Sequence, residues 1–155
     1  MKKLFLLSGL LPLLLAACGS GSTVTAPPAN INPSGAWVAT ETVNGVQRAW
    51  DMNINAVNGS WSTTSLWQGS SGIIDILSIS GTYTPSTAYP LNSNITVLQM
   101  GDSACKVDGI SYILKSVVSG QFVSSNLYKG TEDHFVCENG GFVYKGSGTF
   151  AMTKN

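Results

Sequence analysis

The sequence predicts an all-β fold: an antiparallel up-and-down meander of about eight to nine strands, closed into a small barrel, with a β-sandwich as the second choice. From Ser34 onward no 11-residue window has the apolar spacing of an amphipathic helix. Short alternating runs recur at regular spacing, which is typical of barrels and sandwiches. Four turn dipeptides separate such runs: Asn44-Gly45, Asn58-Gly59, Asp108-Gly109 and Asn139-Gly140.

The expected strands follow from these breaks and from the alternation between them. The stretch from Thr84 to Ser93 contains Pro85 and Pro90 and is the longest interruption. Residues 68–84 have no defined register, because the run from Ile73 to Ile79 offers apolar side chains to both faces. The predicted strands are 35–43, 46–57, 60–67, 73–84, 94–100, 110–118, 121–129, 133–138 and 141–153.

Two of the turns predict the register of the first three strands. A two-residue loop at Asn44-Gly45 places Glu41 opposite Arg48, as an ion pair at the rim worth about 0–1 kcal/mol. A second loop at Asn58-Gly59 pairs the next two strands and places Trp50 opposite Trp67. Side chains alternate between faces, so one face collects all four tryptophans and Ser65, and this face is the predicted interior. Its members are Trp37, Trp50, Trp61, Ser65 and Trp67.

The N-terminus has the pattern of a secretory signal. Lys2 and Lys3 precede a short apolar run from Leu4 to Leu15. The four residues Leu15-Ala16-Ala17-Cys18 resemble the lipobox of bacterial lipoproteins. That resemblance implies that residues 1–17 are a signal peptide and that Cys18 carries the lipid anchor. Residues 18–33 are then the acylated cysteine with a flexible tether, and residues 34–155 form a single β-barrel domain.

The same resemblance implies an address in the cell envelope. The protein would be held to a membrane by its lipid, with palmitate-type acyl chains that bind durably because each buried CH₂ contributes roughly 0.8 kcal/mol. Gly19 follows the cysteine where lipoproteins retained at the inner membrane often have aspartate. In a Gram-negative cell this favours the outer membrane, with the domain facing the periplasm or the cell surface.

Two cysteines remain once Cys18 is assigned to the lipid. An even pair in an oxidising compartment predicts a disulfide between Cys105 and Cys137. A metal site on His134 and Cys137 is the alternative, but it needs two more ligands, and the sequence has no second histidine. The Asn139-Gly140 turn places Cys137 on an apolar face with Phe135, Phe142 and Tyr144, and Phe150 and Met152 follow in phase on that face.

The glycine-tryptophan spacing of the first strands resembles a known group of barrels. Gly35-Ala36-Trp37 opens the first strand and Gly59-Ser60-Trp61 opens the third. This pattern, over residues 35–67, is similar to that of the calycins, the lipocalins and avidins. The resemblance implies an antiparallel barrel that encloses a small ligand.

Charge and motifs narrow the function classes. Lys2 and Lys3 fall in the signal, so six basic side chains face eight acidic ones, which excludes a basic nucleic-acid binder. No phosphate-binding loop is present and no cofactor is expected. The one histidine lies in Glu132-Asp133-His134, expected at a turn or strand edge, and the protein is predicted not to be an enzyme. The primary hypothesis is a binding module whose five interior residues surround a small apolar ligand. The alternative is an envelope protein–protein interaction module or inhibitor with a filled core.

Overall fold

The computed structural model describes residues 29–69 and 72–155, and it contains nine strands and no helix in those ranges. Within the same ranges there is no helix that is long and apolar enough to span a membrane. The strands are β1 (Gly35–Val43), β2 (Val46–Ile54), β3 (Ser60–Gln68), β4 (Ile74–Tyr83), β5 (Leu91–Met100), β6 (Lys106–Val107), β7 (Ile110–Ser124), β8 (Leu127–Glu138) and β9 (Gly141–Lys154).

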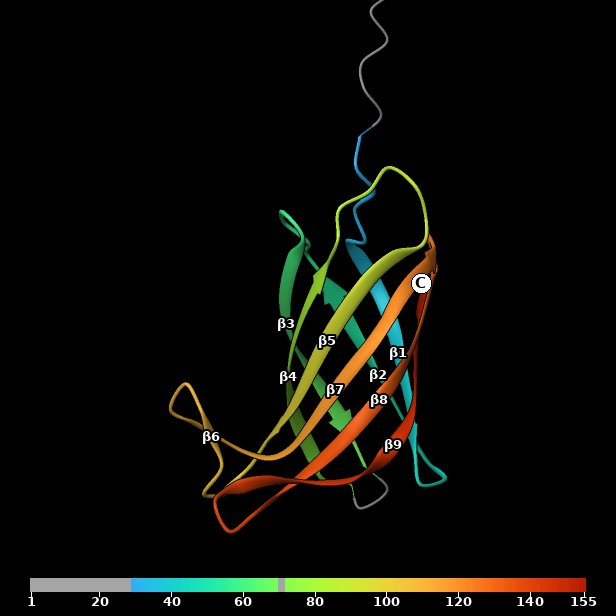
Figure 1. Cartoon of the computed structure of the whole chain (residues 1–155). Helices are drawn as coiled ribbons and strands as arrows, with labels where there is room; N and C mark the ends of the chain where they lie inside the picture. The colour runs from blue at the N-terminus through green and yellow to red at the C-terminus, as the bar shows by residue number, and fades with distance from the viewer. Residues whose placement is uncertain (1–28, 70–71) are drawn as a thin grey trace, which may run out of the picture.

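The strands form one antiparallel sheet that curls into a nearly closed barrel (Figure 1). Its order is β2-β1-β9-β8-β7-β5-β4-β3, and β6 pairs with β7 outside this path. The first and last strands of the domain pair along most of their length, from Trp37–Lys154 to Val43–Gly148. The predicted all-β meander is therefore confirmed, and the continuous sheet excludes the sandwich.

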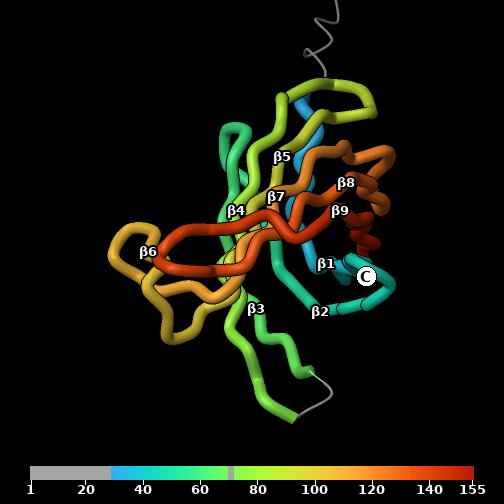
Figure 2. Tube along the Cα trace, turned by 60° about the horizontal axis from the view of Figure 1, so that its bottom comes forward, coloured from blue at the N-terminus to red at the C-terminus, as the bar shows by residue number. Residues whose placement is uncertain are grey.

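The barrel has two ends that differ in what lies there (Figure 1). We call the end with the first described residues, the 58–59 turn and residues 84–90 the upper end. The lower end has the 44–45 turn, the adjoining ends of β3 and β4, the β6 hairpin and the 139–140 turn. Figure 2 shows β6 and the tip of the β8–β9 hairpin projecting together to one side, while the adjoining ends of β3 and β4 project in another direction.

All four predicted turns are two-residue hairpin turns with positive φ at both positions. Asn44, Asn58, Asp108 and Asn139 have φ of 50°, 50°, 49° and 51°, and each is followed by a glycine with φ between 78° and 85°. Asparagine, aspartate and glycine tolerate this conformation better than other residues. The register predicted around Asn44-Gly45 is correct, including Glu41 opposite Arg48 and Trp37 opposite Met52.

The second predicted register is wrong beyond its turn. Val57 and Ser60 form the expected bridge, but β2 and β3 form no further ladder. Trp50 packs against Phe150, with ring centroids 6.0 Å apart, and does not lie in a cross-strand pair with Trp67. The barrel is thus interrupted between β2 and β3, and we call these two facing edges the seam.

Several predicted strand limits are also wrong. The predicted strand 46–57 ends at Ile54, the predicted strand 94–100 begins at Leu91, and the largest error lies at Gly120. The expected break between 110–118 and 121–129 does not exist, because β7 runs through it and the turn lies at Ser125-Asn126. Gly120 pairs with Gly130 in mid-strand, and a Cβ at Gly120 would lie 2.3 Å from the carbonyl oxygen of Lys129. The glycine therefore permits a close approach of two strands. Likewise, the expected strand 133–138 is the second half of β8.

A buried aromatic core fills the barrel. Trp37 packs on Phe122, Phe122 on Tyr128, and Tyr128 on Phe150, with centroid separations of 5.6, 5.1 and 6.0 Å. These tilted and edge-on arrangements are the favoured geometries for aromatic pairs. The predicted interior face is thus correct for Trp37, Trp50 and Trp61, which are all buried, while Trp67 is half-buried against the core.

Two irregularities place the disulfide outside this core. The β8–β9 register shifts between His134 and Phe135, and the β5–β7 register shifts between Gln99 and Met100. Because one extra residue exchanges the faces of a strand, Phe135 and Phe142 lie outside the barrel while Phe150 and Met152 lie inside it. The predicted pairs Cys137–Phe142 and Phe135–Tyr144 are confirmed, but the prediction that Phe150 and Met152 continue the same face was wrong. The predicted disulfide between Cys105 and Cys137 is confirmed. It ties the β6 hairpin to β8.

Candidate binding site at the lower end of the barrel

Four ionisable side chains meet inside the lower half of the barrel, and we call them the charge cluster. Glu41 lies on β1 and Arg48 on β2, directly opposite each other across the hairpin. Glu132 and His134 lie on β8, two residues apart, so both point to the same face as the buried Tyr128. Glu41 and Glu132 are each only 1% exposed, so the barrel holds two carboxyl groups in its interior.

Arg48 organises the contacts within this cluster. Its guanidinium forms an ion pair with the Glu41 carboxylate, and its Nη1 donates to Gln99 Oε1 at 3.3 Å. The same guanidinium lies over the Trp67 ring, with Cζ 5.3 Å from the ring centroid. On the opposite wall, His134 Nδ1 lies 3.6 Å from Glu132 Oε1 and 3.3 Å from Ser116 Oγ. Arg48 therefore joins the charged residues to the aromatic core.

The two buried carboxyl groups have an unusual electrostatic environment. Burial raises the pKa of Glu41 from 4.5 to about 8, against the lowering effect of Arg48, and Glu132 raises this pKa further. Burial thus favours the neutral form of Glu41, whereas Arg48 favours its charged form. Both carboxylate oxygens of Glu132 are buried and have no hydrogen-bond partner among the described residues. Buried polar groups without partners are rare in folded proteins, which draws attention to this end of the barrel.

A cleft opens from the charge cluster to solvent, and we call it the lower cleft. Its volume is about 310 Å³. Arg48, His134 and Lys145 supply its basic side chains, and its lining contains no acidic residue. Lys145 pairs with Glu138 at 2.5 Å at the exposed rim. The rest of the wall is mostly apolar: Val43, Asn44, Val46, Leu114 and Val136.

The residues predicted to surround a ligand lie mostly in the packed interior. Trp37, Trp50 and Trp61 are buried, and Ser65 Oγ donates to the carbonyl oxygen of Asp51. Trp50 and Trp67 border an internal void, which Glu41 and Arg48 also line, and this void has no space for a water molecule. Trp37 and Ser65 line a separate, open cleft of about 470 Å³ between β2 and β3. The five residues thus lie on the interior face, but no single cavity is lined by all of them. Their role in ligand binding stays a prediction.

Glu132 and His134 were not predicted from the sequence to belong to a site, and the Glu41–Arg48 pair lies deeper in the barrel than predicted. Glu132 and His134 were expected at a turn or strand edge, but they lie within β8 and point into the barrel. The Glu41–Arg48 pair was expected at the rim, but it is internal, with side-chain exposures of 1% and 14%. Tyr128, Glu132 and His134 are separated by even numbers of residues. This spacing could have predicted that Glu132 and His134 share the buried face of Tyr128, if the strand had been recognised as continuous.

A metal centre finds no support in the described residues. No group of three or more His, Cys, Asp or Glu side chains lies close enough there to hold a metal ion. The alternative use of Cys137 as a metal ligand is excluded by its disulfide with Cys105. The lower-end site therefore offers a guanidinium, an imidazole and apolar side chains.

Comparisons with known proteins relate the chain to other barrels only by its fold. No protein-family model and no curated protein matches the sequence. A solved structure described as "EF1p2_mFAP2b bound to DFHBI" aligns with a TM-score of 0.51 at 15% sequence identity. The alignment covers 79% of this chain and 93% of that one. This chain thus has the barrel architecture of a protein solved with DFHBI bound.

Proposed function

We propose that this protein is a lipid-anchored, non-enzymatic binding module of the bacterial cell envelope. Its ligand is a small, mostly apolar molecule with one anionic group, and the lower cleft is the binding site. The fold is similar to that of a protein solved with DFHBI bound, which supports the idea that such a barrel can hold a small molecule. The lower cleft is the part of this chain that best fits that role.

The observation that best supports this ligand class is the set of side chains that line the lower cleft. Arg48, His134 and Lys145 line the cleft beside valine and leucine side chains, while the carboxylates that contact them (Glu41, Glu132 and Glu138) lie outside its lining. This lining is complementary to an amphipathic anion. Burial disfavours the charged form of Glu41 and so weakens its hold on Arg48, which allows an entering carboxylate to share the guanidinium. Arginine suits this role because its planar fork binds carboxylates through two parallel hydrogen bonds.

The proposed membrane anchor is compatible with an open cleft. Residues 29–34, which are the end of the predicted tether and the first residue of the predicted domain, lie at the upper end of the barrel (Figure 1). Asn32 Nδ2 donates to the carbonyl oxygen of Ala56 and Trp37 Nε1 donates to that of Pro33, which fixes this segment there. The lower cleft lies at the other end. A lipid on Cys18 would therefore leave the cleft clear of the bilayer. Cys18 itself lies outside the described residues.

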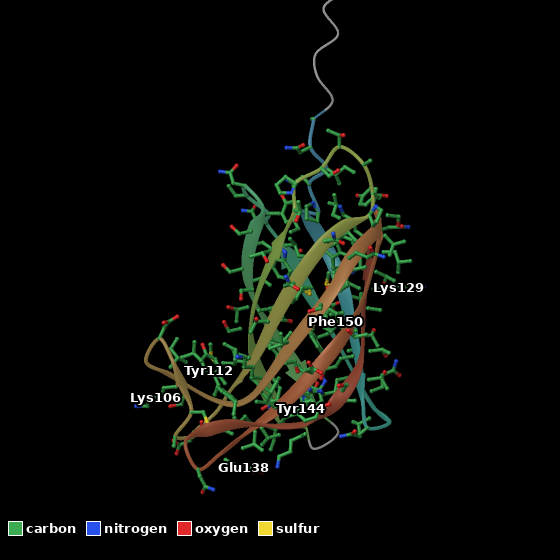
Figure 3. The ribbon with its side chains drawn as sticks, in the orientation of Figure 1. Lys106, Tyr112, Lys129, Glu138, Tyr144 and Phe150 are labelled. Carbon is green, nitrogen blue, oxygen red and sulfur yellow. A yellow bond between two sulfur atoms is a disulfide. The ribbon has the colours of Figure 1, made fainter. Side chains whose placement is uncertain are left out.

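The test is a comparison of three ligands of equal chain length: decanoate, decanol and decylamine. Isothermal titration at pH 7 is expected to show the tightest binding for decanoate. Arg48→Met should weaken decanoate binding by at least about tenfold, equivalent to about 1.4 kcal/mol. Lys129→Met is the matched control, because Lys129 is exposed on the outer side of β8 (Figure 3). Leu114→Trp should block the cleft without removing a charge.

Two outcomes would contradict the proposal. Equal binding of decanoate and decylamine would show that the basic lining does not select the ligand. Decanoate binding that survives both Arg48→Met and Leu114→Trp would place the site elsewhere.

A further inference from the structure

The seam leaves one edge of β3 without a backbone partner. At the two ends of the β3–β4 pair, Tyr83 N donates to the Gly59 carbonyl oxygen and Gly69 N donates to that of Ile73. Antiparallel ladders alternate, so the odd-numbered residues of β3 bond to β4. The even-numbered residues Thr64, Leu66 and Gln68 therefore turn their N–H and C=O groups toward the seam. No strand pairs with that edge in the part of the chain that the structure describes.

The Ser65 side chain occupies the position of a backbone hydrogen bond that a β2–β3 ladder would form. A continuous two-residue hairpin at Asn58-Gly59 would bond Asp51 to Leu66 through their backbones. Instead, the Asp51 carbonyl oxygen accepts a hydrogen bond from Ser65 Oγ. Toward the lower end, the β3–β4 hairpin leaves the barrel wall and projects away from β2 (Figure 2). Over Thr64–Gln68 the edge of β3 thus forms no backbone ladder with β2, and the bond from Ser65 to Asp51 is the one hydrogen bond that crosses the seam there among the described residues.

A second cleft lies at this place, and we call it the seam cleft. Its volume is about 470 Å³, and it is lined by β2 residues 51–53 and β3 residues 63–66, together with Ala36, Trp37 and Asn155. Asp51 is the one charged side chain in its lining, and no ion pair engages Asp51 among the described residues. The seam cleft is therefore complementary to a basic group, unlike the lower cleft.

An apolar strip lies beside this edge on the outer face of the β3–β4 hairpin. Leu66 is 63% exposed and pairs with Ile76, and Ile74 follows two residues before Ile76 on the same face. Exposed apolar residues next to an unpaired strand edge are an association hazard that proteins usually suppress with charges or prolines. Strand β3 contains no charged residue and no proline, which is the pattern expected of an edge that pairs with another strand.

We propose that the seam cleft binds an extended peptide of another protein, which adds to β3 as an antiparallel or parallel strand. The peptide would bond to the backbone of Thr64, Leu66 and Gln68, place a lysine or arginine beside Asp51, and cover Leu66 and Ile76 with apolar side chains. Backbone pairing supplies affinity in this mode of recognition, and the side chains supply specificity.

Amide hydrogen exchange on the full chain in detergent micelles tests this assignment. The probe is a capped peptide, Thr-Val-Lys-Val-Thr-Val, at millimolar concentration. Pairing should slow exchange at the amides of Thr64, Leu66 and Gln68 by at least about tenfold. The same peptide with glutamate in place of lysine should bind more weakly. Asp51→Asn should remove most of the difference between the two peptides.

A proline variant separates backbone pairing from side-chain contact. The N–H of Leu66 points toward the seam, so Leu66→Pro removes a seam donor but no β3–β4 bond, and proline is tolerated at such an edge. In this variant the peptide should leave exchange at Thr64 and Gln68 unchanged. Leu66→Thr is the matched control: it keeps the N–H and should retain the slowed exchange.

Three outcomes would overturn the proposal. The first is unchanged exchange at all three amides with the lysine peptide. The second is a Leu66→Pro variant that still shows peptide-dependent slowing. The third is slow exchange at these amides in the free chain, which would mean that residues 19–28 or a second copy of the chain already occupies the edge.

Discussion

Replacing Glu41 by glutamine should remove a pH dependence that the buried charge cluster imposes on folding. Glu41 is 1% exposed, and its carboxylate faces Arg48 on one side and Glu132 on the other. Glutamine has nearly the same shape but cannot ionise. The substitution therefore tests the electrostatics of the site with little change in packing.

The sign of the effect follows from the direction of the pKa shift. Burial raises the pKa of Glu41 from 4.5 to about 8, so the folded protein holds this proton more tightly than the unfolded chain does. Its contribution to stability is fully present below about pH 4.5 and is lost as the pH rises to about 8. Each pKa unit corresponds to about 1.4 kcal/mol, so the loss is at most about 5 kcal/mol. We expect a loss of about 3–5 kcal/mol between these limits.

Urea unfolding followed by tryptophan fluorescence at pH 5 and pH 9 measures this effect. The wild-type free energy of unfolding should fall between these two values, and that of Glu41→Gln should fall much less. The variant should thus equal the wild type near pH 5 and exceed it at pH 9. Glu138→Gln is the control, because Glu138 is exposed at the rim, where it pairs with Lys145. It should follow the wild-type profile.

A constant difference between Glu41→Gln and wild type across this pH range would refute the reasoning. Such a result would mean that Glu41 ionises at its ordinary pKa, and hence that water or a rearranged Arg48 solvates the buried carboxylate.

Three further predictions concern the disulfide, the core and the anchor. Replacing Cys105 and Cys137 together by serine opens a link between residues 32 apart and should lower the free energy of unfolding by about 3–4 kcal/mol, so an unchanged urea midpoint would contradict a stabilising bridge. Trp50→Ala should cost about 3–5 kcal/mol because the ring is buried, and Trp67→Ala should cost less because its ring is half-buried; equal costs would argue against this core. Cys18→Ser should move the protein from the membrane to the soluble fraction on fractionation, and membrane retention would contradict the lipobox prediction.

Local chemistry determined much of the fold. Asparagine or aspartate followed by glycine specifies a two-residue turn, because these residues tolerate positive φ. A fixed turn sets the register of a hairpin, so the sequence alone predicted that Glu41 faces Arg48 and that Trp37 faces Met52. Alternation then predicted which face of β1 and β2 is buried. The pairing of Cys105 with Cys137 followed from counting cysteines.

Other features depend on contacts between residues far apart in the chain. Gly120 is typical of a turn, but it lies in mid-strand because Gly130 and the carbonyl oxygen of Lys129 approach it from β8. The irregularity between His134 and Phe135 exchanges the faces of the hairpin, and no local pattern marks it. For this reason Phe150 and Met152 lie inside the barrel while Phe142, on the same strand, lies outside it, and the sequence pattern did not predict this change of face.

The candidate site was decided by barrel closure. β2 pairs with β1 and β3 with β4, but the two hairpins separate beyond Val57 and Ser60, which opens the seam that the turn alone predicted to be bonded. Closure through β1 and β9, with β8 alongside, then brings Glu132 and His134 to Glu41 and Arg48. The sequence therefore determined strands, turns and local register, since these depend on a few neighbouring residues. The lower cleft and the seam depend on how the sheet curves as a whole, and only the tertiary structure decides that.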